Sequence, residues 1–304
     1  MPCIYELVDA LPSVVVGMLA PLKQVEAAKA LAARNITAFS LEFIPRISRA
    51  QAMDVLSSQA NIGGYEAVIR AAAACPKMFP MMITAAGTIA PSKVFVIGAG
   101  VAGLQAIATA KRLGAVVEAY DIRPAVKEQI QSLGARFVEL PLTRADAQTE
   151  GGYAREQTDE DRQKQVELMT RHVIGADCVI TTAAVFGKPP PLLIPDPVVQ
   201  QMRPGSVLMD LAADPDAGRG NCEATRPGQQ YTTPNGVLID GTLNLPALKP
   251  VHASQAYANN MLAFLKELIL DGQLKIDLED QVQGGAAITH GGKVVNEMVE
   301  KALG

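Results

Sequence analysis

The sequence predicts an α/β protein with two Rossmann-like domains, each built on a doubly wound parallel sheet. The chain has 304 residues, and this length favours two domains because a domain typically holds about 100–200 residues. Short apolar runs alternate with helical patterns, which is typical of a parallel sheet covered by helices. One glycine-rich turn, GAGVAG at residues 98–103, follows an apolar strand and precedes a helical pattern.

Composition and charge exclude several classes of protein. Apolar residues make up 49% of the chain, which is enough for packed cores and too much for a disordered chain. The net charge of −4 gives no electrostatic reason to expect a nucleic acid as partner. No run of about 18 apolar residues is present, so we expect no direct membrane span.

The cysteines indicate reduced thiols in a cytoplasmic compartment. Their positions, Cys3, Cys75, Cys178 and Cys222, fit neither a CxxC pair nor a zinc site, so no metal is expected. The N-terminal segment carries acidic residues early and no basic stretch, which argues against a secretory signal.

The first domain is expected to span residues 1–83 and to be completed by about residues 253–304. Periodicity predicts strands at 14–19 and 36–44, helices at 25–34, 53–74, 253–270 and 294–303, and a hairpin at 284–295. We expect Gly63 and Gly64 to interrupt the 53–74 helix, because glycine disfavours helix interiors. Gly291 and Gly292 are expected at the turn of the hairpin.

The second domain is expected to span residues 84–252. The small, proline-containing segment at residues 84–92 is predicted to be the linker between the domains. Helical patterns separate most of the predicted strands, which lie at residues 93–97, 116–120, 136–139, 178–181, 207–210 and 237–240.

The GAGVAG turn predicts a dinucleotide site. Gly98 permits the tight turn, Gly100 lets the backbone approach a pyrophosphate, and Gly103 lets the helix pack closely on the strand. The N-terminus of the following helix offers unpaired N–H groups and a partial positive charge to that pyrophosphate. A glycine-rich turn in another doubly wound protein is the alternative interpretation.

Asp121 strengthens the dinucleotide hypothesis. It ends the next predicted strand and lies 18 residues after Gly103, close to the spacing of about 20 typical of an acid that binds the adenosine ribose. A carboxylate there favours NAD over NADP, because it repels a 2′-phosphate. Arg123 leaves the choice open, since an arginine at this place can accept a phosphate.

A second polar cluster directly follows the apolar run at residues 36–44. Residues 45–58, PRISRAQAMDVLSS, bring together Arg46, Arg49, Gln51 and Asp54. Ligands of open parallel sheets bind beyond the carboxyl ends of strands, so these groups could face a nicotinamide. From composition alone, a solvated loop that leads into a helix is the favoured interpretation.

Several long motifs show a resemblance to a known family. The 45–58 segment, TAAGTIAP at 84–91, GVAGLQAIATAKRLGA at 100–115 and DIRP at 121–124 resemble the alpha subunit of proton-translocating nicotinamide nucleotide transhydrogenase. GGYA at 151–154, TT at 181–182, GKPPP at 187–191, PGSV at 204–207 and GNC at 220–222 support this resemblance. Alanine dehydrogenase is a relative with the same general architecture.

The resemblance implies a function and partners. Members of this family bind NADH between two Rossmann-like domains and form homodimers. They pass hydride directly to NADP⁺ on a separate component that docks on a membrane subunit, and this transfer is coupled to proton translocation. The chain is therefore expected in the cytoplasm, peripheral to the inner membrane through its partner subunits.

The resemblance also implies the residues of the site. Arg46, Gln51, Asp54 and Ser57 would hold the nicotinamide, and Tyr153 would close over it on a loop; an ordinary exposed loop tyrosine is the alternative. The remaining expected cofactor contacts are Ile47, Ser48, Gly98, Gly100, Val101, Ala102, Gly103, Asp121, Ile122, Arg123, Gly152, Gln165 and Ala184.

The resemblance leaves two other functions open. The family's first domain begins before the equivalent of residue 1, so the first domain is expected to be shortened at its N-terminus. A non-catalytic NAD-binding module is therefore one alternative. An amino-acid dehydrogenase like alanine dehydrogenase is the other, with His252 as its candidate base, because His172 is expected at a solvated surface and His290 in a hairpin turn.

Overall fold

The computed structural model describes residues 13–139, 159–185 and 187–304, and these form parts of two compact units. The first unit comprises Met1–Gln59 and Val251–Gly304, and the second comprises Ala60–Pro250. The division falls inside helix α2 (Val55–Ala74), whereas the sequence placed it after residue 83. Ala67, Val68 and Ala71 of this helix lie in the core of the second unit.

The second unit is built on a seven-stranded sheet with the order β10-β11-β9-β8-β5-β6-β7. All neighbours pair in parallel except β10 and β11. From β7 to β11 this order is that of a doubly wound sheet, with its switch point between β5 and β8. The strands are β5 (Lys93–Ile97), β6 (Val116–Tyr120), β7 (Arg136–Phe137), β8 (Cys178–Thr181), β9 (Val207–Asp210), β10 (Gln230–Thr232) and β11 (Leu238–Asp240).

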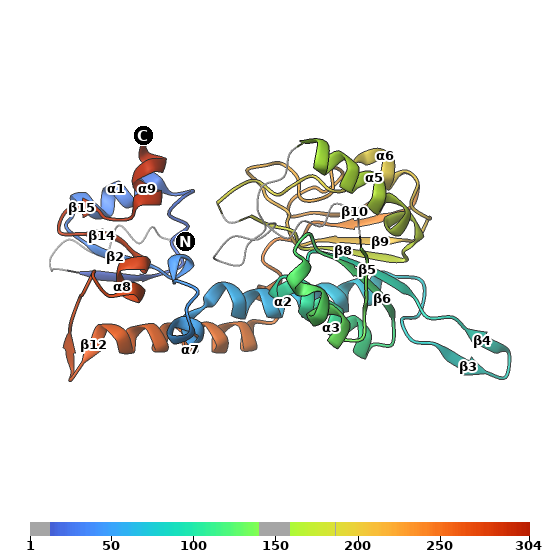
Figure 1. Cartoon of the computed structure of the whole chain (residues 1–304), viewed down its shortest axis with the longest axis horizontal. Coiled ribbons are helices and arrows are strands. Elements are labelled where there is room, and N and C mark those ends of the chain that lie inside the picture. The colour runs from blue at the N-terminus through green and yellow to red at the C-terminus, as the bar shows by residue number, and fades with distance from the viewer. Residues whose placement is uncertain (1–12, 140–158, 186) are drawn as a thin grey trace. The chain divides into compact units, whose positions relative to one another are not determined.

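Helices cover both faces of this sheet, as Figure 1 shows for α3 on one side and for α5 and α6 on the other. Successive residues of β5 point to opposite faces, so Val94 and Val96 join one core, and Phe95 and Ile97 join the other. The helices are α3 (Val101–Arg112), α4 (Lys127–Ser132), α5 (Asp159–Gly175), α6 (Asp196–Val199), η4 (Pro124–Val126) and η5 (Leu245–Leu248). The predicted α/β class with a parallel sheet is confirmed.

Two predictions for the chain before β5 are wrong. Helix α2 runs without a break through Gly63 and Gly64, although both glycines were expected to interrupt it. The expected linker at residues 84–92 contains strand β4 (Gly87–Ile89), which pairs with β3 (Met82–Thr84) in an antiparallel hairpin. This hairpin extends away from the large sheet, and the chain then returns to β5 (Figure 1).

The described part of the first unit contains a mixed four-stranded sheet with the order β1-β2-β14-β15. Strands β1 (Val14–Gly17) and β2 (Thr37–Ser40) pair in parallel. Strands β14 (Ala287–His290) and β15 (Lys293–Val294) form the predicted hairpin, and β14 pairs antiparallel with β2. The strand expected at residues 36–44 ends at Ser40, because the chain turns there into the short helix η2 (Leu41–Phe43).

The core of the first unit lies between its sheet and two helices, α7 (Pro250–Leu268) and α8 (Gln281–Ala286). Phe39 of β2 and Phe264 of α7 make an edge-to-face contact with ring centroids 5.4 Å apart. Helix α1 (Val25–Ala33) and helix α9 (Glu297–Leu303) lie on the other face of this sheet (Figure 1). The small hairpin β12 (Ile269–Leu270) and β13 (Gln273–Leu274) follows α7.

Among the residues that the structure describes, no helix is both long and apolar enough to cross a membrane.

We predict that Phe264→Ala destabilises the first unit by about 3–5 kcal/mol, because a fully buried aromatic ring leaves a cavity that its neighbours fill only in part. Leu262→Ala is the control, since Leu262 lies on the same helix with 53% of its surface exposed. Urea unfolding curves followed by circular dichroism measure both. Equal midpoints for the two variants would contradict the assignment of Phe264 to the core.

Candidate functional site

The GAGVAG turn lies at the switch point of the large sheet, where β5 and β8 end side by side. Gly98 leaves β5 with φ at +94°, a conformation that favours glycine. Its N–H donates to the carbonyl of Tyr120 at the end of β6 (2.8 Å). Gly100 is the N-cap of α3, so the first turn of this helix begins directly above the carboxyl end of the sheet.

Two of the glycines are required by close packing. A Cβ on Gly103 would lie 1.9 Å from the carbonyl oxygen of Gly98, so only glycine lets α3 approach β5 this closely. A Cβ on Gly98 would lie 2.7 Å from the hydroxyl of Thr182. Thr182 follows β8 and donates from that hydroxyl to the Gly98 carbonyl (3.0 Å), which joins the ends of β5 and β8.

Gly100 is different, because the packing of the protein does not require a glycine there. A Cβ on Gly100 would meet no atom of the described chain within 4 Å, and φ is −74°. Gly100 and Val101 are both exposed at the N-terminus of α3. The exposed backbone therefore leaves room for a group to approach the first N–H groups of the helix, which attract anions such as a pyrophosphate.

Asp121 directly follows β6 and is 6% exposed. Its Oδ2 accepts from the backbone N–H of Ala99 (2.7 Å) and from the Arg123 guanidinium (2.9 Å). Its Oδ1 accepts from the backbone N–H and from Nε of Arg123 (2.8 and 2.9 Å). A carboxylate has about four acceptor positions, and these bonds occupy all of them. Asp121 therefore holds the glycine turn through Ala99.

Arg123 and Asp121 form an ion pair with little exposure to solvent, 14% and 7% of the two side chains. Hydrogen bonds to Asp121 raise the pKa of the Arg123 guanidinium above its ordinary value, although burial opposes this. The positive charge of Arg123 is thus neutralised at short range. A 2′-phosphate at this edge would have to compete with Asp121 for that guanidinium.

The loop after β8 is held by side chains that the sequence analysis did not single out. Asn221 accepts from the N–H of Ala183 (3.0 Å) and donates to its carbonyl (2.8 Å). Asp210, at the end of β9, accepts from the hydroxyls of Thr181 (2.8 Å) and Thr225 (2.6 Å). These bonds hold the loop in place, with Ala184 exposed beside it. Two features of the sequence mark these residues: Asn221 lies in the GNC motif, and Asp210 ends a predicted strand.

The polar cluster of residues 45–58 lies in the first unit. Asp54 immediately precedes α2 and accepts from the backbone N–H and the hydroxyl of Ser57 (2.8 and 2.5 Å), which is the geometry of a helix N-cap. Arg46, Ser48 and Gln51 are exposed, and Ile47 is partly buried. Asp54 and Ser57, two of the residues expected to hold the nicotinamide, therefore also form the N-terminal cap of α2.

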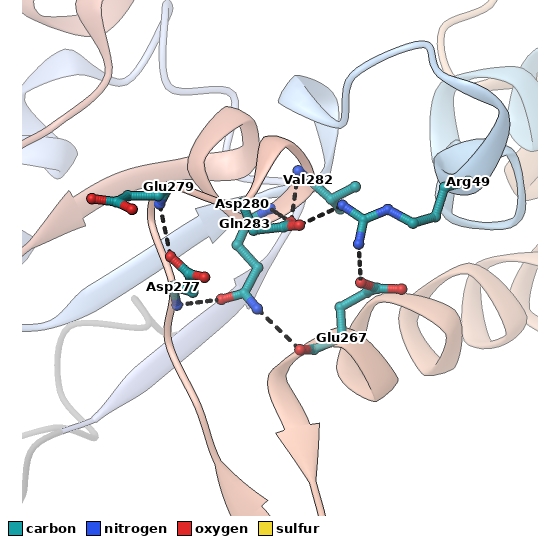
Figure 2. A network of polar contacts seen from close by, with 7 residues as sticks. All are labelled: Arg49, Glu267, Asp277, Glu279, Asp280, Val282 and Gln283. Carbon is teal, nitrogen blue, oxygen red and sulfur yellow. Dashed lines mark hydrogen bonds and ion pairs between the residues drawn. The ribbon is translucent and has the colours of Figure 1, made fainter.

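Arg49 anchors this cluster to the rest of the first unit. Figure 2 shows its guanidinium between Glu267 of α7 (3.0 Å) and Asp280 (2.5 Å), the N-cap of α8. Backbone N–H donation from Gln283 lowers the pKa of Asp280 below its usual range, and the bond from Arg49 adds to this effect against the desolvation of the carboxylate. Gln283 also bonds Asp277 and the carbonyl of Glu267 (Figure 2).

The remaining predicted residues include three expected cofactor contacts and two histidines. Gly152 and Tyr153 lie outside the described residues, and Gln165 lies on α5 with its side chain outside them. His172 is not at a solvated surface as expected: its side chain is 10% exposed and bonds Glu118 (2.8 Å), because α5 packs on the sheet. His252 is exposed on α7. Among the described residues no three potential ligands converge on a metal site, and the described cysteines, Cys75, Cys178 and Cys222, are free thiols.

The doubly wound sheet and its glycine turn define a Rossmann-type dinucleotide-binding protein. Family models for the N-terminal and C-terminal domains of alanine dehydrogenase/PNT match residues 7–63 and 67–297. The chain belongs to this family, among the NAD(P) transhydrogenase alpha subunits. The resemblance inferred from the sequence motifs is confirmed.

Two comparisons with transhydrogenases support this assignment. The chain is 48% identical over 272 residues to an NAD(P) transhydrogenase subunit alpha of Rhodospirillum rubrum, covering 88% of this chain and 70% of that protein. A transhydrogenase structure from Sinorhizobium meliloti superposes with a TM-score of 0.79 at 45% identity, over 93% of this chain and 75% of that one. An L-alanine dehydrogenase structure, at 23% identity and a TM-score of 0.76, covers 100% of this chain and 78% of its own and shares the fold.

We predict that Asp280→Asn reduces the loss of stability of the first unit in acid. The pKa of Asp280 is lowered by folding, so its carboxylate stabilises the folded state above its ordinary pKa of 3.8, and this contribution is lost as the pH falls through the lowered value. Asparagine keeps an N-cap oxygen but has no charge to lose.

Urea midpoints across acidic pH measure this effect. Glu279→Gln is the matched control, because Glu279 is the exposed neighbour of Asp280 (Figure 2). If the wild type and Asp280→Asn lose stability in parallel as the pH falls, the network around Asp280 does not stabilise the unit in the way described.

Proposed function

We propose that this chain is the NAD(H)-binding component of a proton-translocating NAD(P) transhydrogenase and binds the NAD(H) pyrophosphate at the GAGVAG turn. The open position at Gly100 carries this proposal. A Cβ there would meet nothing in the described chain, so its lack of a side chain is accounted for by a ligand that approaches the backbone. Membership of the transhydrogenase alpha subunits supports NAD(H) as this dinucleotide.

The pyrophosphate would lie against Gly98, Gly100, Val101, Ala102 and Gly103. Asp121, Ile122 and Arg123 would frame the adenosine ribose. Because every acceptor position of Asp121 is occupied, a ribose hydroxyl would bind there by replacing one of the bonds from Arg123. The ion pair supports a preference for NAD(H), since a 2′-phosphate would meet a carboxylate and a guanidinium that is already paired.

The nicotinamide and its ribose would be held by Arg46, Ile47, Ser48, Gln51, Asp54 and Ser57, with Gly152, Tyr153, Gln165 and Ala184 completing the site. Amides, hydroxyls and an arginine are suited to binding a carboxamide and a ribose. The anchoring of Arg49 to α7 and α8 supports this role, because a positioning loop must itself be held in place.

The reaction would be direct hydride transfer from C4 of NADH to C4 of NADP⁺, which gives NAD⁺ and NADPH and releases no proton. Such a step needs no general acid or base. It needs the two rings at about 3–3.5 Å and the exclusion of water, which the residues around the site would provide. The single GxGxxG fingerprint supports a second nucleotide site on a partner component.

The partners would be an NADP(H)-binding component and a membrane subunit, so the chain would work in the cytoplasm, peripheral to the inner membrane. The relatives' description as a subunit supports such an assembly. A second copy of the chain is the proposed homodimer partner. The exposed apolar residues of the β3–β4 hairpin, Met82, Ile83 and Ile89, support an interface there, because large exposed apolar groups mark contact surfaces.

We predict that Gly100→Ala weakens NADH binding at least tenfold, about 1.4 kcal/mol, because the added methyl group occupies the path of the pyrophosphate. Gly175→Ala is the matched control. A Cβ on Gly175 would also meet no atom within 4 Å, and Gly175 lies at the far end of α5, so NADH binding is expected to be unchanged. Fluorescence titration with NADH and NADPH, and thermal melts, measure the effects.

Three outcomes of this titration would contradict the proposal. If wild-type protein binds neither nucleotide, or if NADPH binds as tightly as NADH, the chain is not a selective NAD(H) component. If Gly100→Ala binds NADH as wild type does, the pyrophosphate lies elsewhere. Hydride transfer to an NADP⁺ analogue with purified partner components then tests the catalytic part.

A further inference from the structure

Helix α2 contains two consecutive glycines whose surroundings differ sharply. A Cβ on Gly64 would lie 2.1 Å from the carbonyl oxygen of Ala102 and 3.0 Å from its Cα. A Cβ on Gly63 would approach nothing closer than Pro246 at 3.7 Å, which is an ordinary contact. Glycine is unfavourable in helix interiors, so packing must explain why a glycine stands there. The close contact with Ala102 explains Gly64, whereas no such contact constrains Gly63.

Ala102 belongs to the first turn of α3, inside the GAGVAG turn. Gly103 presses this turn against the carbonyl of Gly98, where a Cβ would lie 1.9 Å away. The first turn of α3 is therefore confined between β5 and α2, and each contact is close enough to require glycine. Its remaining border, at Gly100 and Val101, is exposed.

Helix α2 is held too firmly in the second unit to move away from α3. Ala67, Val68 and Ala71 are fully buried in the core. Arg70 forms an ion pair with the buried carboxylate of Asp240 (2.6 Å), and Glu66 forms one with Lys249 (3.0 Å). A side chain at position 64 would therefore displace the first turn of α3 toward its exposed border, which is the side where a pyrophosphate would bind.

We propose that Gly64 is a positioning residue for the dinucleotide: by admitting the backbone of Ala102, it sets where the first N–H groups of α3 lie. The inference rests on the proposed pyrophosphate site at the GAGVAG turn. Gly64 does not contact the nucleotide and acts only through the placement of Ala102. Small displacements of this kind matter, because hydrogen bonds to phosphate oxygens weaken steeply with distance and angle.

The test compares Gly64→Ala with Gly63→Ala in titrations with NADH and with ADP, which carries the pyrophosphate without the nicotinamide. Gly64→Ala is expected to weaken both ligands at least fivefold. Gly63→Ala is expected to bind both within twofold of wild type, because its methyl group fits.

A third variant separates positioning from general loosening. Ile130→Ala removes a fully buried side chain of α4 from the same core and changes no residue of α2 or of the GAGVAG turn. It is expected to lower the melting temperature and to leave the affinity of the folded protein unchanged. If Ile130→Ala weakens NADH as much as Gly64→Ala does, or if Gly64→Ala binds NADH normally, Gly64 has no positioning role.

A measurement on wild-type protein covers the case in which Gly64→Ala does not fold. Hydrogen exchange with and without NADH is expected to show slower exchange in a peptide around Gly64 as well as in the first turn of α3. Protection of α3 without α2 would overturn the inference alone. Failure of wild-type protein to bind NADH or ADP would overturn the proposed function together with it.

Discussion

The close approach between the first turn of α3 and the end of β5 determines most of the site. Gly98 and Gly103 meet there at a distance that excludes any side chain, and Thr182 ties the same carbonyl to the end of β8. The contact places the positive end of a twelve-residue helix at the switch point of the sheet. Asp121 then bonds Ala99 within the turn, so the position of one loop depends on three strands.

Electrostatics at the edge of β6 follows from this arrangement. Asp121 is buried because it must reach Ala99, and a buried carboxylate is costly unless it is paired. The guanidinium of Arg123 supplies the opposite charge and two of the hydrogen bonds to Asp121, and the backbone N–H of Arg123 supplies a third. Arg123 is therefore not an unpaired cation. Asp121 and Arg123 left the choice between NAD and NADP open in the sequence, and in the structure they form one ion pair. Selectivity would depend on displacing an internal ion pair, not on the net charge of two independent residues.

Local patterns predicted the parts of the fold that depend on neighbouring residues. The strand, turn and helix at 93–112 were predictable because periodicity and glycine spacing report directly on them. The prediction of a break in α2 was wrong because Gly64 packs against α3, which is distant in sequence. This packing outweighs the low helix propensity of glycine. His172 was misplaced because burial against Phe95 and pairing with Glu118 are tertiary. Asp210 and Asn221 were not singled out because the end of a strand and the GNC motif mark their positions, whereas their bonds to Cys222 and Ala183 are tertiary.

The buried polar residues around the turn form their hydrogen bonds within the chain, and this affects how a ligand can bind. Asp121, Asp210 and Asn221 use their acceptors and donors within the chain, so they serve to fix loops. What the described turn presents outward is mainly backbone, at Gly100 and Val101. Recognition of a phosphate there would depend on the placement of N–H groups that exist before the ligand arrives, and a preformed site loses little affinity to reorganisation. Small residues that set backbone distances, such as Gly64 and Gly103, therefore matter at this site in the way that charged side chains matter at others.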